Sequence, residues 1–424
     1  MYVFNTPFSI IMELTSIFAN SDISRPIRHD FRKSLDFFGM RGKIVAMKRS
    51  LEKYIQKDLK RKIILMTGPR QTGKTTLAKM LSPHFDYFNY DSAEHRLSLL
   101  EKSWDRSRDI VIFDELHKMK NWKSWIKGIY DTEGIPPGLV VTGSAKLDTY
   151  KKVGDSLAGR FFEFRLHPLD LKEIKGVLGP DKLDVKLNRL LKIGGFPEPY
   201  LENDETFYNR WKRSHLDIIL KQDLIDLENI HQITSIETLI QLLRKKIGSP
   251  ISYRSLAEDL QCSDKTIKRW LTILESLYVV FKVTPFHRNI SRSILKSPKY
   301  YFYDTGQIPD DPGMKLENLV ACALIKEMHF REDCLGEKWN IYYVKNKDGR
   351  EIDFLLTKSE KPVLMLEVKW GGDERSPNFT FFDKYVSGAR KIQIVKELKR
   401  EKTYPDGTEI RLAQNWLSEM RLEK

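Results

Sequence analysis

One run of nine residues has the types and spacing needed to bind a polyphosphate. It consists of Gly68, Pro69, Arg70, Gln71, Thr72, Gly73, Lys74, Thr75 and Thr76. The glycines allow backbone N–H groups to turn toward the β- and γ-phosphates, Lys74 adds a positive charge, and the Thr75 hydroxyl can ligate Mg²⁺. An apolar run of strand character precedes the loop at residues 63–66, and an amphipathic helix follows it. Because a phosphate-binding loop requires this context, the sequence predicts a site for ATP and Mg²⁺.

Two acids at the end of a second apolar run would complete a hydrolytic site. Residues 110–113 read Ile-Val-Ile-Phe and lead directly into Asp114 and Glu115. Asp114, which is 40 residues after Lys74, suits Mg²⁺ binding through water opposite Thr75. Glu115 suits the positioning and polarisation of the attacking water. We therefore expect ATP hydrolysis as well as ATP binding.

A third strand and an arginine could respond to the γ-phosphate. The run at residues 139–141 ends in the hydroxyls of Thr142 and Ser144. If this strand lies beside the one that carries Asp114, one hydroxyl would approach the γ-phosphate; the alternative is an ordinary turn. Arg160 could stabilise charge on the γ-phosphate of its own or a neighbouring subunit, and the second case would imply a homo-oligomer. The alternative for Arg160 is a structural salt bridge.

A second group of acids is predicted on a β-hairpin near the carboxyl end. Residues 350–356 and 363–369 read as antiparallel strands, and their period of two places Asp353, Glu367 and Lys369 on one face. Opposed carboxylates repel each other unless a cation lies between them. Mg²⁺ held by Asp353 and Glu367 could activate water for attack on a phosphodiester, with Lys369 orienting the nucleophile. The alternative is a set of cross-strand ion pairs to Lys369 in a domain without catalysis.

A compact helix–turn–helix pattern occupies residues 249–284. Its second helix, at residues 265–275, follows Ser263, a natural N-cap. Four residues lie on the exposed amino-terminal part of this helix: Lys265, Thr266, Lys268 and Arg269. This part of a recognition helix meets base edges and phosphates, so we expect contact with DNA, and the strand expected at residues 278–283 would be a wing. The alternative is a module that packs against the ATPase or mediates protein assembly.

These residues require an α/β scaffold built from several parts. Strands and helices alternate up to about residue 167, which predicts a mostly parallel sheet. The domains expected are an amino-terminal extension (1–44), a P-loop ATPase core (45–168), a helical lid or linker (169–246), a winged helix-turn-helix (247–305) and a mixed α/β domain (306–424), for which the resemblance given below implies a nuclease-like fold. The extension is either a partner-binding arm or an over-extended gene start with Met40 as the initiator.

The composition is that of a globular protein with a basic balance. The chain has 424 residues, of which 41% are hydrophobic and 31% charged, and its formal net charge is +14. This charge favours a polyanionic partner such as DNA, although a generally Lys-rich surface would give the same value. The three cysteines lack metal-ligand spacing and suit a reducing cytosol. No stretch approaches ~18 uninterrupted apolar residues, so we expect a cytoplasmic protein without a membrane span.

The motifs resemble a prokaryotic family of AAA-type ATPases that carry a carboxy-terminal domain of uncharacterised function. The likeness runs from about Leu51 to Lys369 and rests on the segments 68–76, 114–115, 142–144, 156–160, 194–198 and 301–306. It implies an AAA-like core followed by a winged helix and a nuclease-like domain. The acids Asp353 and Glu367 with Lys369 resemble the pattern of restriction-enzyme-type and Holliday-junction-resolvase-type nucleases, and Glu317 matches the accessory acid of those enzymes.

The expected function combines these parts. It is that of a Mg²⁺-dependent ATP-hydrolysing protein that associates with DNA through a winged helix and carries a metal-dependent, restriction-endonuclease-like domain. The alternative is an ATP-dependent regulatory switch, or a protein that binds a protein partner, in which the nuclease-like domain does not cleave.

Overall fold

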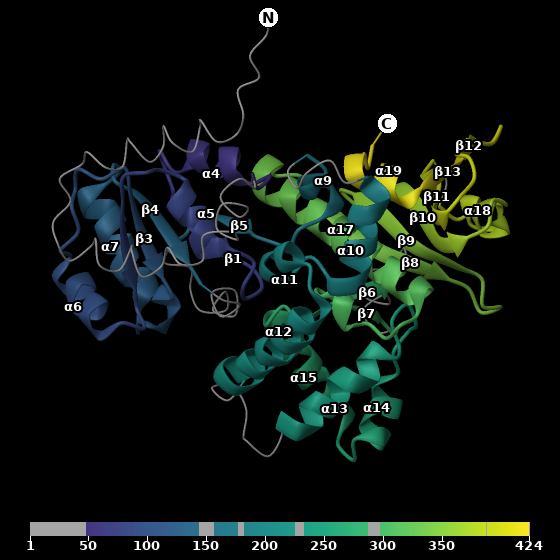
Figure 1. Cartoon of the computed structure of the whole chain (residues 1–424), viewed down its shortest axis with the longest axis horizontal. Coiled ribbons are helices and arrows are strands. Elements are labelled where there is room, and N and C mark those ends of the chain that lie inside the picture. Colours follow the sequence, from purple (N-terminus) through teal and green to yellow (C-terminus); the bar gives the residue numbers. More distant parts are fainter. Residues whose placement is uncertain are drawn as a thin grey trace, which may run out of the picture. The chain divides into compact units, whose positions relative to one another are not determined.

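A five-stranded parallel sheet forms the first part of the described chain. The computed structural model describes residues 48–143, 157–176, 182–224, 233–286, 297–386 and 388–423, so the extension at 1–44 and Ser144 lie outside it. The strand order is β2-β3-β4-β1-β5 (Figure 1). The strands are β1 (Ile63–Thr67), β2 (Phe85–Asn89), β3 (Ile110–Asp114), β4 (Gly138–Thr142) and β5 (Phe161–Arg165). Every neighbouring pair is parallel, which confirms the expected α/β core.

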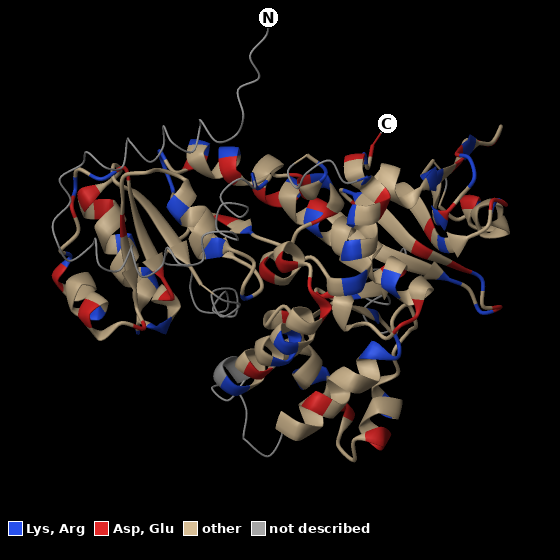
Figure 2. Ribbon diagram, in the orientation of Figure 1, with Lys and Arg blue, Asp and Glu red and all other residues tan. Residues whose placement is uncertain are grey.

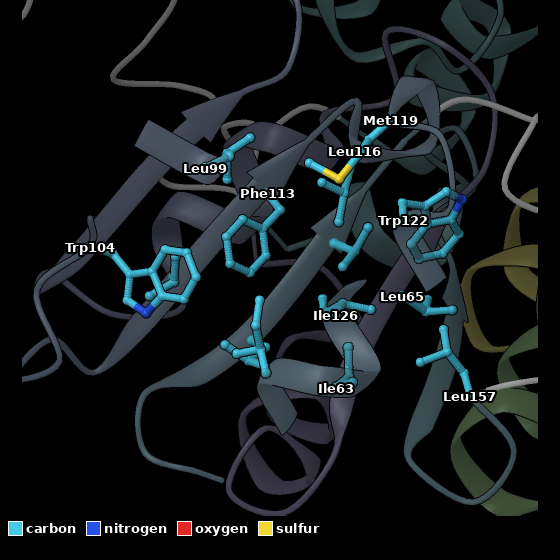
Figure 3. Packing of buried hydrophobic residues seen from close by; sticks show 14 residues of the cluster. Ile63, Leu65, Leu99, Trp104, Phe113, Leu116, Met119, Trp122, Ile126 and Leu157 are labelled. Carbon is cyan, nitrogen blue, oxygen red and sulfur yellow. The ribbon is translucent and has the colours of Figure 1, made fainter. Parts of the chain in front are cut away.

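The central strands of this sheet are buried on both faces. All residues of β1, β3 and β4 are buried, as continuous apolar runs between two helical layers must be. The helices of this part are α4 (Glu52–Asp58), α5 (Lys74–Met80), α6 (Ala93–Glu101) and α7 (Trp122–Glu133). Trp122 and Ile126 of α7 pack on one face together with Trp104 and Phe113 (Figure 3). Residues of α4 and α5 pack on the other face, which completes the core.

A helical part follows the parallel sheet, as the sequence predicts. Its helices are α9 (Leu171–Ile174), α10 (Leu183–Ile193), α11 (Pro197–Glu202), α12 (Glu205–Ile218) with a π-helical continuation (Ile219–Leu224), and α13 (Ile233–Arg244). Tyr208 and Trp211 of α12 pack against Ile193 and Phe196. The turn at 194–196 therefore holds α10 and α12 together.

An eight-stranded mixed sheet forms the rest of the described chain. Its order is β12-β13-β11-β10-β9-β8-β6-β7. The strands are β6 (Val280–Pro285), β7 (Lys299–Phe302), β8 (Trp339–Lys345), β9 (Glu351–Lys358), β10 (Lys361–Gly371), β11 (Arg390–Glu397), β12 (Lys402–Thr403) and β13 (Thr408–Leu412). The helices are α14 (Tyr253–Asp259), α15 (Asp264–Ser276), α17 (Pro312–Leu335), α18 (Pro377–Asp383) and α19 (Ala413–Glu419), with a 3-10 turn at Thr305–Gln307.

This sheet continues across the expected boundary between residues 305 and 306. β6 and β7 form an antiparallel pair after α14 and α15, and β6 also pairs in parallel with β8 through Thr284↔Tyr342 and Pro285↔Tyr343. β8, β9 and β10 are antiparallel neighbours, and β11 joins β10 in parallel after α18. The boundary therefore lies inside one continuous sheet.

The longest helix of the described chain links the two sheets. α17 has 24 residues, and its Phe330 packs into the core beneath β1 and β3, while its Leu316 is fully buried at the other end. Within the described residues, neither α17 nor another helix combines the length and the apolarity needed to cross a membrane.

Candidate functional site

The phosphate loop lies at the carboxyl end of β1 and leads into α5. Gly68 has φ +131°, and a Cβ atom there would lie 2.4 Å from the carbonyl oxygen of Leu166, so only glycine fits. Gly73, the residue before α5, has φ +91° and open space where a side chain would be. The backbone of the loop can therefore approach a ligand closely, which a phosphate-binding loop must do.

The ammonium group of Lys74 is bound by backbone carbonyl groups of the phosphate loop. Its Nζ donates to the carbonyl oxygens of Gly68 at 3.0 Å and Pro69 at 2.6 Å. The Thr72 hydroxyl donates to the same Pro69 oxygen at 2.9 Å. The lysine is buried, so its charge lies at the centre of the loop, where an entering phosphate would meet it.

Asp114, the last residue of β3, receives hydrogen bonds from three hydroxyl groups. The Thr75 hydroxyl and the Tyr87 phenol donate to Oδ2 at 2.9 and 2.8 Å, and the Thr142 hydroxyl donates to Oδ1. β4 pairs with β3 so that Thr142 is the direct neighbour of Asp114, which is the arrangement the sequence suggested. Burial and the negative charge of Asp114 raise the pKa of Tyr87 well above its usual value, so Tyr87 stays a neutral donor.

Tyr87 was not found by sequence reasoning. It lies on β2, and only the order of the strands shows that β2 is next to β3. The local sequence around Tyr87 contains no motif that would mark it as a neighbour of the acid.

Glu115 follows Asp114 in a left-handed backbone conformation, with φ +55°. Its Oε2 lies 3.8 Å from Lys118 Nζ, and within the described residues this buried oxygen has no hydrogen-bond donor. Burial raises the pKa of Glu115, while the charges of Lys118 and Arg70 oppose the increase. A carboxylate with an unused oxygen beside the phosphate loop can accept a hydrogen bond from water.

Arg160 directly precedes β5, at the opposite end of the parallel strands from the phosphate loop. Its carbonyl oxygen accepts the N–H of Ile63, the first residue of β1, whereas the phosphate loop follows the last residue of β1. Its side chain is partly exposed and donates to Asp131 Oδ1 at 2.7 Å. This geometry favours the neighbouring subunit or the salt bridge over contact with the phosphate of the same subunit.

Arg49 connects the phosphate loop with α17 and was missed in the sequence. Its guanidinium donates to the Thr72 carbonyl oxygen at 3.0 Å and pairs with Glu173 at 3.1 Å. Lys326 of α17 donates to the second oxygen of Glu173 at 2.6 Å. Burial alone would raise the pKa of Glu173, but the charges of Arg49 and Lys326 lower it to about 2, so Glu173 is ionised.

The predicted hairpin is formed by β9 and β10, with a turn at Ser359 and Glu360. Phe354 pairs with Leu366, and continuing this antiparallel register by one residue sets Asp353 opposite Glu367. Asp353 Oδ2 accepts the backbone N–H of Val368 at 2.8 Å. Desolvation, with repulsion from Glu317, raises the pKa of Asp353 to about 8.

Lys299, rather than Lys369, contacts the acids at this hairpin. Lys299 is fully buried at the start of β7, with Nζ 3.3 Å from Glu317 Oε1, and it also pairs with Glu351. Burial alone would lower the pKa of Lys299, but these carboxylates raise it above its usual value, so the lysine is charged. Lys369 is exposed at the sheet surface. In the alternative interpretation Lys369 would pair with Glu351, but Glu351 pairs with Lys299 and Lys345, and no local motif marks Lys299.

Glu367 has one satisfied and one unsatisfied oxygen. Oε1 accepts the side-chain amide of Asn378 on α18 at 2.8 Å, while the buried Oε2 has no hydrogen-bond donor in the described chain. Within the described residues, no group of three or more His, Cys, Asp or Glu side chains is arranged to hold a metal ion. The expected pair Asp353 and Glu367 is therefore present without a closed ligand set around it.

The helix–turn–helix residues lie on α15, which begins after Ser263 as predicted. The Ser263 hydroxyl accepts the N–H of Thr266 at 3.1 Å and also contacts its hydroxyl, so Thr266 belongs to the cap. Lys265, Lys268 and Arg269 are exposed, and Ile267, Trp270, Leu271 and Leu274 form the buried face. Figure 2 shows that α13–α15 carry charges of both signs. The exposed cations at the start of α15 are therefore a small basic group within a part of the molecule of mixed charge.

Comparison with known protein families assigns a described family to the part with the parallel sheet and gives no function for the parts that follow. Residues 60–175 match the family model described as AAA domain. This part of the chain is therefore similar to AAA-type ATPase domains. Residues 184–309 and 312–413 match two models described as domains of unknown function, DUF8612 and DUF4143. The second of these contains the hairpin and its acids.

Several curated relatives are similar over most of this chain, and all are named as uncharacterized proteins. One from Methanocaldococcus jannaschii is 26% identical over 354 residues, which cover 74% of this chain and 77% of the relative. One from Mycobacterium tuberculosis is 25% identical over 319 residues, covering 71% and 68%. One from Haemophilus influenzae is 23% identical over 411 residues, covering 87% and 98%.

Two solved structures show a remote likeness. A Thermotoga maritima RuvB variant is 14% identical, with a TM-score of 0.30, covering 59% of this chain and 99% of that one. A replication initiator DnaA, bound to AMPPCP and single-stranded DNA, is 16% identical, with a TM-score of 0.29, covering 54% and 88%. Both likenesses are too distant to support an argument about this chain.

Proposed function

We propose that this protein is a Mg²⁺-dependent ATPase that acts in association with DNA. The observation that carries the proposal is the environment of Asp114, which lies beside Thr75 of the phosphate loop and receives hydrogen bonds from hydroxyl groups. A buried carboxylate with neutral donors fits a divalent cation, because the cation can supply the missing positive charge. When bound, Mg²⁺ would be held at Thr75 and Asp114 and would neutralise charge on the phosphates.

The other residues of the site have separate roles in this proposal. Lys74 exchanges its contacts with Gly68 and Pro69 for contacts with the phosphates. Glu115 accepts a hydrogen bond from the attacking water through its unused oxygen. Thr142, fixed by Asp114 in the neighbouring strand, senses the γ-phosphate.

ATP binding and hydrolysis test this proposal directly. Lys74→Ala should abolish ATP binding, measured by titration calorimetry, while circular dichroism shows an intact fold. Lys57→Ala, a control near the end of α4, should bind and hydrolyse ATP as the wild type does. Full nucleotide affinity in Lys74→Ala would overturn the assignment of the phosphate loop.

Arg160 would act on the ATP of a neighbouring subunit. This role is supported by its partial exposure at the edge of the sheet away from its own phosphate loop. Arg160→Ala should lower ATP hydrolysis without changing ATP affinity. Adding Glu115→Gln protein should restore part of the activity, because its intact Arg160 can then act on the ATP site of an Arg160→Ala subunit, which retains Glu115. No restoration in a mixture that forms hetero-oligomers would leave Arg160 as the partner of Asp131.

DNA contact is proposed for the exposed cations of α15. The two helices α14 and α15 with the β6–β7 pair support a winged-helix interpretation, in which Lys265, Lys268 and Arg269 face the phosphates. Replacing Lys268 and Arg269 by Ala should weaken duplex DNA binding and reduce the slope of log K against log salt by about 2. Arg254→Ala on α14, which removes a cation paired with Glu258, is the control. Unchanged binding in the double variant would contradict contact through α15.

The carboxy-terminal part is proposed to be nuclease-like. The succession α17, β8, β9, β10, α18 and β11 supports this proposal, since it sets Asp353 and Glu367 on adjacent strands and Glu317 on the helix. The second candidate, a partner-binding switch that does not cleave, is favoured by Lys299, which already pairs with Glu317. Mg²⁺- or Mn²⁺-dependent cleavage of linear, single-stranded and four-way-junction DNA decides between them. Cleavage that disappears in Glu367→Ala supports the nuclease, and no cleavage by ATP-hydrolysing protein supports the switch.

A further inference from the structure

A buried lysine lies where the acids of the second sheet converge. Lys299 has no exposed surface, and its Nζ contacts Glu317 on α17 and Glu351 on β9. Glu317 Oε1 also accepts the phenol of Tyr301 at 2.7 Å. Three separate elements, β7, β9 and α17, are therefore joined through one ammonium group.

The acids around this lysine outnumber the cations that contact them. Glu317 and Glu351 share Lys299, and Lys345 contacts the other oxygen of Glu351 at 2.7 Å from a partly exposed position. Asp353 lies two residues after Glu351 on β9, so both acids lie on the same face of this strand. In the described chain, the buried Oε2 of Glu367 has no hydrogen-bond donor although Glu367 is only 2% exposed. The unpaired Oε2 of Glu367 is a second observation, separate from the ion pairs of Lys299, which indicates that this group of acids can accept a cation.

We propose that Lys299 is the resident cation of the acid cluster formed by Glu317, Glu351, Asp353 and Glu367, and that it excludes a divalent metal ion from this cluster. A metal ion and the ammonium group compete for the same carboxylate oxygens, so the metal binds only when Lys299 is removed or withdraws. The absence of a closed set of three metal-binding side chains in the described residues agrees with this, since two of the acids point to the lysine. The proposal concerns metal access and does not depend on ATP hydrolysis.

The position of Lys299 also indicates how it could withdraw. β7 is the outer strand of the sheet, and within the described residues it pairs only with β6. A shift of β7 would therefore break one ladder of hydrogen bonds rather than two. β7 follows the proposed DNA-contacting helices in the chain, so an event at those helices could change the occupancy of the cluster.

Metal binding to the full-length chain tests the proposal. All proteins carry Asp114→Asn, without nucleotide, to reduce binding at the ATP site, and Mn²⁺ is the probe. The parent should show no Mn²⁺ bound at the cluster, whereas Lys299→Met should bind one Mn²⁺ per chain, because the repelling charge is gone. Binding is measured by electron paramagnetic resonance, and the melting temperature should rise with Mn²⁺ in the variant. Adding Asp353→Asn to Lys299→Met should remove both effects.

Two further variants keep the proposal testable. Lys345→Met removes a lysine that contacts the same Glu351 from the exposed side, and it should bind no Mn²⁺ at the cluster. If Lys299→Met does not fold, Lys299→Met with Glu351→Gln removes one charge of each sign and should still gain the Mn²⁺ site. Mn²⁺ binding in the parent that Asp353→Asn abolishes would overturn the proposal, as would a folded Lys299 variant without the site. Neither outcome affects the ATPase proposal, which is measured with Asp114 intact.

Discussion

The two acidic sites of this protein receive their hydrogen bonds from different kinds of donor. At the end of β3, Asp114 is held by the hydroxyls of Thr75, Thr142 and Tyr87, which carry no charge. In the second sheet, Glu317 and Glu351 share the ammonium group of Lys299, and the Tyr301 phenol is an additional donor to Glu317. Neutral donors fix a carboxylate in place but leave its charge available, whereas a lysine removes that charge from the site.

The difference teaches that acids alone do not define a metal site. Asp353 and Glu367 lie on the adjacent strands β9 and β10, yet the buried cation beside these strands is Lys299 of the chain itself. Asp114 has only uncharged donors around it. Under the two proposals above, the charge of the donors distinguishes the site that binds Mg²⁺ from the site that excludes it.

The largest effect on stability is expected from removing the buried lysine. Lys299→Met should lower the free energy of unfolding by about 2–4 kcal/mol, because it leaves the partly buried carboxylates of Glu317 and Glu351 without their buried cation. Lys345→Met, at the exposed side of Glu351, should cost less than about 1 kcal/mol. Urea denaturation at neutral pH measures both. Equal costs for the two variants would show that Lys299 has no special role in the second site.

At the ATP site, the corresponding effect is on rate rather than on stability. Glu115→Gln keeps the shape of the side chain but removes the charged acceptor for water, so ATP hydrolysis should fall about 10²–10³-fold. ATP affinity and melting temperature should remain near those of the wild type. Single-turnover hydrolysis with saturating Mg²⁺ checks this prediction. A variant with unchanged turnover would remove Glu115 from the mechanism.

The dependence of stability on pH should differ between the wild type and Asp353→Asn. The pKa of Asp353 is raised from 3.8 to about 8 in the folded chain, so its contribution to stability is present below pH 3.8 and is lost as the pH rises through 8. Between pH 5 and pH 8, the wild type should therefore lose on the order of 2–4 kcal/mol relative to Asp353→Asn. Denaturation of both proteins at several pH values measures the difference. Parallel curves would show that Asp353 is not desolvated.

The smallest effects are expected from two tyrosines that donate to acids in the two sites. Tyr87→Phe and Tyr301→Phe each remove a phenol hydrogen bond to a carboxylate and should cost about 1–2 kcal/mol in the absence of ligand. Mg²⁺ with ATP should reduce the deficit of Tyr87→Phe, because the cation then balances Asp114. It should leave the deficit of Tyr301→Phe unchanged. Thermal unfolding with and without Mg²⁺ and ATP compares the two.

Features that depend on neighbouring residues in the chain could be predicted from the sequence. The buried runs of β1, β3 and β4 follow from continuous apolar stretches. The β9–β10 hairpin follows from two alternating strands around a short turn, and the start of α15 follows from the serine cap. The residues of the phosphate loop were found in the same way, because their spacing is fixed by the loop itself.

Contacts that depend on the order of strands or the path of a long helix could not be predicted. Tyr87 reaches Asp114 only because β2 lies next to β3, and Arg49 reaches the loop from before α4. Lys299 precedes Asp353 by 54 residues and meets Glu317 only because α17 and β7 pack together. Which cation pairs with an acid depends on the tertiary structure. A local motif therefore indicates Lys369 as the lysine of this site, whereas Lys299 forms the ion pairs with the acids.

The shared sheet has a consequence for how this protein can be divided or recombined. The two family matches of unknown function meet between residues 309 and 312, yet β6 and β7 from the first complete the sheet of the second. A chimaera joined at that point would pair foreign strands at β6 and β8 and would separate Lys299 from Glu317. Residues 184–309 and 312–413 are therefore expected to occur together in related proteins, because neither segment completes the sheet without the other.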